Sequence, residues 1–173
     1  MNTDSVETIT NGFPNPPNSI PKIRGKPTRK TLDVVCDALI SNAASVHTIL
    51  GGGKPGYGAI CMSPARYNAI PNTIPFVTPL SPGDYSIDTS IKNAAHREER
   101  QHEYNLRMQK FMTYHRVEQA CKNIFLACVP SECYLKLKID PTGYTGVSLY
   151  TLIKHVYTKH GKITRCSKSI RGR

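Results

Sequence analysis

Apolar residues recur at every third or fourth position in three separate stretches of this 173-residue chain, and this spacing constrains the fold more than any other feature. The stretches cover residues 32–43, 117–128 and 149–156. A helix places residues at that spacing on one face, whereas a half-buried strand needs strict alternation of apolar and polar residues. The pattern predicts an all-α fold, a single helical domain of five or six helices around one core.

Capping residues set the expected ends of the first and last of these helices. Thr28 or Thr31 can cap the first helix, because a threonine oxygen can accept a hydrogen bond from a backbone N–H in the first turn. This helix is expected to end near Val46. Ser148 is the expected cap of the last helix, and Gly161 its C-terminal stop.

The longest helix is expected in the middle of the chain. The run Asp-Thr-Ser at residues 88–90 is interpreted as its cap, and residues 113–115 as a break before the buried face resumes. Pro130 should end it, since proline has no backbone N–H to donate. A further short helix is expected over residues 131–138.

Five glycines occur within residues 51–58, which indicates unusual backbone angles or close packing of main chain. Three of them fit the dinucleotide fingerprint G-x-G-x-x-G, but that site needs a strand before the loop and a helix after it. Here a helix precedes the loop, residues 59–62 are expected to be extended, and a short helix is expected over residues 64–70. We expect a structural loop and no bound cofactor.

Composition divides the chain into three parts. Residues 1–27 are polar and rich in proline, so we expect a disordered leader, because such a segment buries too little apolar surface to offset its ordering entropy. Residues 28–161 form the expected helical domain, and residues 162–173 a basic tail. The leader ends in a second basic run, over residues 22–30. Both ends are thus expected to be disordered and basic.

The net charge of the chain is +11, from 23 Lys and Arg against 12 Asp and Glu. Such an excess attracts polyanions over long range, and nucleic acid is the commonest class of polyanion. The tail carries cations, no acid and no aromatic residue, which favours phosphate contacts without base stacking. We therefore expect non-specific RNA binding there, with a merely solubilising tail as the alternative. The candidate residues are Lys162, Arg165, Lys168, Arg171 and Arg173.

The cysteine spacings match neither the usual zinc-site patterns nor a secreted disulfide framework with supporting signals. The first 18 residues contain no apolar signal core, and no apolar run is long enough to span a bilayer. We expect a cytoplasmic protein with reduced, mostly buried thiols, without metal, disulfide or membrane partner. The cysteines are Cys36, Cys61, Cys121, Cys128, Cys133 and Cys166.

No catalytic site stands out, so we expect a non-enzymatic protein without a small-molecule substrate. A P-loop is excluded because Pro55 follows Lys54 where Ser or Thr is required. The run at residues 88–90 matches the Asp-Thr-Gly of aspartic proteases only in part, since serine replaces the glycine. A cysteine–histidine nucleophile pair stays open, because such pairs form in space rather than in sequence.

Several packing and loop segments occur in a characteristic order. They are Asn-Ala-Ala-Ser-Val at 42–46, Leu-Gly-Gly-Gly at 50–53, Gly-Tyr-Gly-Ala-Ile at 56–60, Ser-Pro-Ala-Arg-Tyr at 63–67, Asn-Thr-Ile-Pro-Phe-Val at 72–77, Leu-Tyr-Thr-Leu-Ile-Lys-His-Val-Tyr at 149–157 and Gly-Lys-Ile-Thr at 161–164. In this order, from about Thr28 to Thr164, the chain resembles the Gag-like, capsid-related region of copia-type LTR retrotransposons, apparently truncated.

The resemblance implies a helical structural protein that self-associates into particles and encloses RNA. Many chains of that family end in a zinc knuckle, Cys-x2-Cys-x4-His-x4-Cys, and this sequence contains none. The alternative is a host-derived nucleic-acid-binding or regulatory adaptor protein. A reverse transcriptase or integrase reading frame directly downstream would favour the retrotransposon origin, and its absence the adaptor.

Overall fold

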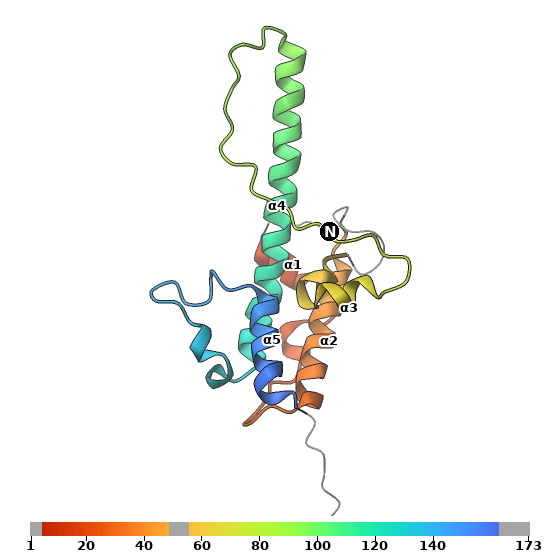
Figure 1. Cartoon of the computed structure of the whole chain (residues 1–173), viewed down its shortest axis with the longest axis vertical. Coiled ribbons are helices and arrows are strands. Elements are labelled where there is room, and N and C mark those ends of the chain that lie inside the picture. Colours follow the sequence, from red (N-terminus) through yellow and green to blue (C-terminus); the bar gives the residue numbers. More distant parts are fainter. Residues whose placement is uncertain (1–4, 49–55, 163–173) are drawn as a thin grey trace, which may run out of the picture.

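The structure is a computed structural model that describes residues 5–48 and 56–162 (Figure 1). Over these residues the fold is all-α, as the sequence predicts, with five α-helices, four short 3-10 segments and no strand. The elements are α1 (Val6–Asn11), η1 (Pro17–Ser19), α2 (Arg29–Ser45), η2 (Gly56–Cys61), α3 (Pro64–Asn68), α4 (Ala94–Cys128), η3 (Ser131–Cys133), η4 (Leu135–Leu137) and α5 (Leu149–His160).

The core lies where α2, the C-terminal half of α4 and α5 pack together, with η2 against α2 and α1 against α4 (Figure 1). The three apolar stretches of the sequence supply its buried faces, because each stretch forms one side of a helix. The central residues are Leu32, Val35, Leu39, Val117, Cys121, Ile124, Leu149, Leu152 and Val156.

The predicted ends of α2 and α5 are confirmed. Of the two candidate caps, Thr28 is the N-cap: its side chain accepts a hydrogen bond from the Thr31 N–H, and the Thr31 side chain accepts one from the Thr28 N–H, so α2 begins with a capping box. The Ser148 side chain accepts from the Thr151 N–H at the start of α5, and Gly161 caps its end. Capping residues that were evident in the sequence thus lie at these helix ends.

The expectation of a disordered leader is wrong for the described part of residues 1–27. Ser5 caps α1, and Ile9 on that helix is completely buried against the core. Phe13 and Ile20 are also buried, and Ile23 packs beside them. The prolines separate these apolar residues in sequence, but they do not prevent them from reaching one hydrophobic surface, so the helical domain begins before residue 28.

Three 3-10 segments stand where the sequence predicts an extended run and a short helix. Residues 59–62 are not extended, because Gly56–Cys61 forms η2. Gly58 packs its main chain closely against α2, where a Cβ atom would lie 3.6 Å from side-chain atoms of Ile40 and Ala44. The expected helix over residues 131–138 is a pair of single 3-10 turns, η3 and η4. Residues 51–55 of the glycine loop lie outside the described residues.

The longest helix is α4, and it differs from expectation at two points. It begins after Asn93, whose side chain accepts from the Ala95 N–H, while Asp88 closes a separate turn by accepting from the Ser90 N–H. Residues 113–115 do not break it, since its 35 residues are continuous. Despite this length, α4 is not apolar enough to cross a membrane, and no other helix in the described ranges is both long and apolar enough to do so.

The N-terminal half of α4 projects beyond the core as an arm (Figure 1). The first buried side chain of α4 is Thr113, and from residue 94 to residue 107 every side chain except Tyr104 is exposed. A strap, residues 77–93, runs along the arm. It is attached where the Tyr104 hydroxyl donates to the Gly83 carbonyl at 2.7 Å and where Arg100 lies 3.6 Å from Asp88.

Candidate nucleic-acid interface

One of the five predicted RNA-binding residues lies in the described part of the chain. Lys162 is exposed and directly follows Gly161, the C-terminal cap of α5. The other four, Arg165, Lys168, Arg171 and Arg173, lie outside the described residues. The structure therefore fixes the position of the first tail residue at the end of α5.

The second basic run, residues 22–30, is held against the same domain. Ile20 is buried just before it, and the Ile23 N–H donates to the Cys128 carbonyl at the end of α4, at 2.8 Å. Pro27 is buried at the entrance to α2. The backbone of the run is thus anchored, while its cations are all exposed: Lys22, Arg24, Lys26, Arg29 and Lys30.

A hydrogen bond between α2 and α5 brings the two basic segments to one end of the molecule. The Tyr157 hydroxyl donates to Asp33 Oδ1 at 2.5 Å, and Cys36 lies beside this pair. Burial and the hydrogen bond with Asp33 raise the pKa of Tyr157 well above its ordinary value, so the phenol stays protonated. Burial raises the pKa of Cys36 to about 12, so this thiol is not a thiolate at neutral pH.

The cations at this end form what we call the basic pole. Figure 1 shows the start of α2, the end of α5 and the segment before α2 at the end of the molecule opposite the arm. Lys136 of η4 joins them, since it lies close enough to affect the pKa of His155 on α5. The exposed members of the pole are Lys22, Arg24, Lys26, Arg29, Lys30, Lys136, Lys159 and Lys162.

Acidic residues offset little of this charge. Asp33 accepts a hydrogen bond from the Tyr157 hydroxyl, and its Oδ2 atom lies 3.9 Å from Arg29 Nε. The first turn of α2 contains no acid, and Arg29 and Lys30 occupy it instead. A helix N-terminus carries a partial positive charge that favours acids, so these two cations gain nothing from the helix dipole. Their presence is not explained by the stability of α2.

Two histidines of α5, His155 and His160, each have one buried ring nitrogen. The Nε2 atom of His155 and the Nδ1 atom of His160 are buried and have no hydrogen-bond partner among the described residues. Burial, then Lys159 and Lys136, lowers the pKa of His155 below its ordinary value, because each disfavours the imidazolium. His155 therefore adds no positive charge at neutral pH.

The cysteines occupy the core rather than the pole. Cys36, Cys61, Cys121, Cys128 and Cys133 are all buried, as expected, and Cys166 lies outside the described residues. Within the described ranges, no three cysteine, histidine or acidic side chains are arranged to hold a metal ion. Burial raises the pKa of Cys128 and of Cys133, which makes both thiols poor nucleophiles.

Comparisons with known proteins give no further identification: no protein family, curated protein or solved structure matches this chain. The proposed function therefore rests on the geometry described above and on the sequence pattern.

The sequence analysis found the two basic runs but not their meeting point. Residues 22–30 and Lys162 are far apart in the chain, and their proximity depends on how α5 packs on α2. Lys136 lacked any local signal, since it is a single lysine in a short turn. The pairing of Tyr157 with Asp33 could not be deduced from helical spacing, because the two residues are 124 positions apart.

Proposed function

We propose that this chain is a non-enzymatic, Gag-like structural protein that binds single-stranded RNA without sequence preference and self-associates in the cytoplasm. RNA binding is supported mainly by the fact that the 22–30 run and the end of α5 lie together at the basic pole. A surface that gathers cations from three separate elements at one end attracts phosphates more strongly than the same charges spread evenly.

The makeup of the pole favours backbone contacts over base reading. Its cations are lysines and arginines on the surface, and the predicted tail residues add more of the same kind without an aromatic residue. Sequence-tolerant binding to single strands combines phosphate contacts with stacking on aromatic side chains, and here the phosphate contacts predominate. We therefore expect similar affinity for different RNA sequences of equal length.

The test is fluorescence anisotropy with labelled single-stranded RNA at several salt concentrations. Each phosphate neutralised on a single strand contributes roughly 0.7 to the slope of log affinity against log salt. Lys26→Glu and Lys30→Glu should each weaken binding and lower that slope by about 0.7 or more. Removing residues 165–173 eliminates four cations and should lower the slope by about 2 to 3.

Lys92→Glu is the matched control, because it makes the same change in net charge at an exposed residue of the strap, far from the pole. It should leave affinity nearly unchanged. If Lys92→Glu weakens binding as much as Lys30→Glu, only net charge matters and the pole is not the site. If the full chain binds no RNA at low salt, the proposed function is wrong.

A further inference from the structure

We propose that the arm is a self-association surface, on which the α4 arm of a second copy of this chain lies antiparallel. This inference rests on the proposed self-association and names the surface that would carry it. The starting observation is that the strap covers only one side of the arm and leaves the opposite side exposed (Figure 1). From residue 94 to residue 107 every side chain except Tyr104 is exposed.

A helix that packs on so little is not expected to be stable alone. Residues 94–112 extend the helix by roughly 28 Å beyond the core, at about 1.5 Å per residue. Most helical stability in proteins comes from tertiary packing of an apolar face rather than from intrinsic propensity. The strap supplies only part of this, through the Tyr85–Tyr104 ring contact at 5.1 Å and the Tyr104 hydrogen bond.

The strap also leaves apolar side chains exposed on this projection. Leu80 is 84% exposed, and Val77 and Ile87 are each 66% exposed. On α4 itself, Leu106 is 42% exposed. Exposed apolar side chains gathered on one projection are typical of a surface that meets another protein.

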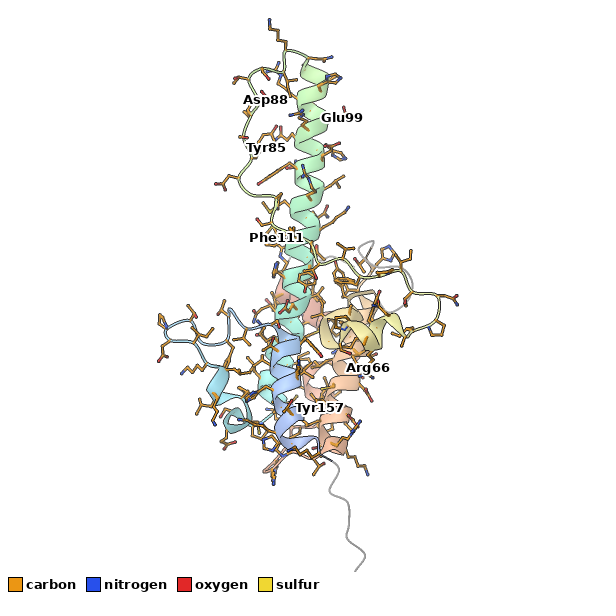
Figure 2. All side chains as sticks on the ribbon, in the orientation of Figure 1. Arg66, Tyr85, Asp88, Glu99, Phe111 and Tyr157 are labelled. Atoms are coloured by element: carbon orange, nitrogen blue, oxygen red, sulfur yellow. The ribbon has the colours of Figure 1, made fainter. Side chains whose placement is uncertain are left out.

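The face of the arm away from the strap is continuous and exposed, and we call it the seam. Residues 95, 99, 102, 106 and 109 follow one another at intervals of four and three, so they lie along this one face of the helix, and Leu106 is its one large apolar residue. Figure 2 shows Glu99 on the side of α4 away from Tyr85 and Asp88 of the strap. Leu106 lies near the middle of this seam, so an antiparallel partner would bring two copies of Leu106 close together.

The distribution of charge along the arm favours a second copy that lies antiparallel. Residues 84–103 carry five of the chain's 12 acids, namely Asp84, Asp88, Glu98, Glu99 and Glu103, against three cations. The next part of α4, residues 104–117, has cations and no acid. The tip of one arm is therefore acidic and its base is basic, so two antiparallel arms place opposite charges together twice.

The complementarity is specific to the arm. Two copies of a chain with a net charge of +11 repel each other over most of their surfaces. In the antiparallel arrangement Glu99 of one copy lies near Lys110 of the other, and the two-fold symmetry repeats this pair. Parallel arms would place Glu99 against Glu99, which is unfavourable.

The experiment exchanges these charges in the nuclease-treated full chain and measures mass by light scattering after gel filtration. The wild type should form dimers. Glu99→Lys alone and Lys110→Glu alone should each weaken dimerisation by about tenfold or more, because each places like charges together twice. An equimolar mixture of the two variants should restore dimers, since every contact between an E99K chain and a K110E chain again pairs opposite charges.

Glu132→Lys and Lys154→Glu are the matched controls, with the same charge changes at exposed residues outside the arm, and both should dimerise like the wild type. Circular dichroism of each variant checks the helix content. If neither arm variant weakens the wild-type dimer, or if the mixture stays monomeric, the arm is not the dimer interface, although the protein still self-associates. A wild type that is monomeric at every concentration would overturn both the arm and the proposed self-association.

Discussion

Glu118 of α4 caps α5 from 31 residues away, because its Oε1 atom accepts a hydrogen bond from the backbone N–H of Leu149 at 3.1 Å. Lys122, one turn later, lies 4.0 Å from the same oxygen and donates to the Tyr144 carbonyl at 3.4 Å. The side chains of both residues are nearly buried. This acid–lysine pair therefore joins the two helices and the loop before α5 at the edge of the core.

Glu118→Ala should destabilise the protein by about 3 kcal/mol, since it leaves Lys122 buried without its counter-charge and the Leu149 N–H without an acceptor. Glu118→Gln should cost less, because the amide oxygen can still accept. Urea unfolding followed by circular dichroism gives the free energy of unfolding. Glu132→Ala, at an exposed acid, should change it by less than about 0.5 kcal/mol. Equal losses for Glu118→Ala and Glu132→Ala would contradict the structural role of the pair.

Tyr157→Phe should reduce stability by about 1 kcal/mol at pH 7, because Asp33 loses the hydroxyl that donates to it. The pKa of Tyr157 is raised in the folded state, while the unfolded chain releases the phenolic proton near its ordinary value of about 10. The contribution of Tyr157 to stability is therefore complete below pH 10 and falls as the pH rises above it.

The measurement is urea unfolding of wild type and Tyr157→Phe at pH 7, 9 and 10.5. Other buried tyrosines and cysteines also favour lower pH, and Lys122, whose pKa burial lowers, has the opposite effect. These contributions occur in both proteins and cancel in the difference. The difference should be constant from pH 7 to 9 and shrink at pH 10.5, and a constant difference throughout would show that Tyr157 does not titrate as described.

Ile9→Ala should cost about 2 to 5 kcal/mol, the usual loss for a large aliphatic side chain removed from a core. This tests whether the leader is part of the domain. Glu7→Ala changes an exposed residue of the same helix, α1, and serves as the control. If Ile9→Ala and Glu7→Ala leave thermal unfolding equally unchanged, α1 does not pack on the core in solution.

The buried thiols should be unreactive in the folded protein. In a Cys166→Ser variant only the five described cysteines remain, and burial raises the pKa of Cys36, Cys128 and Cys133. Reaction with a chromogenic disulfide reagent at pH 8 should therefore be slow without denaturant and fast in guanidinium chloride. Rapid labelling of several thiols in the native protein would contradict the described burial.

Helical spacing and capping were sufficient to predict the helices whose stability is decided locally. Thr28, Ser148 and Gly161 each act on the backbone within one turn, so their positions in the sequence determine α2 and α5. The buried faces of these helices followed from the three-to-four spacing of Leu32, Val35 and similar residues. The all-α class was thus accessible without any tertiary information.

The features that the sequence analysis missed depend on partners far away in the chain. Ile9 and Phe13 looked too sparse to form a core, and only the surface offered by α4 makes their burial favourable. Residues 113–115 looked like a break because Tyr and His interrupt the apolar stripe, yet nothing there removes a backbone hydrogen bond. The basic pole was predicted in its parts, while its assembly required the packing of α5 on α2.

The continuity of α4 has a mechanical consequence. One helix of 35 residues reaches from the tip of the arm to Cys128, which holds the segment leading to the basic pole. At about 1.5 Å per residue it acts as a spacer of roughly 50 Å. Whatever binds at the arm and whatever binds at the pole are kept too far apart to compete. In an antiparallel pair the two poles would face outward at opposite ends of a rod, so one dimer could bridge two strands of nucleic acid.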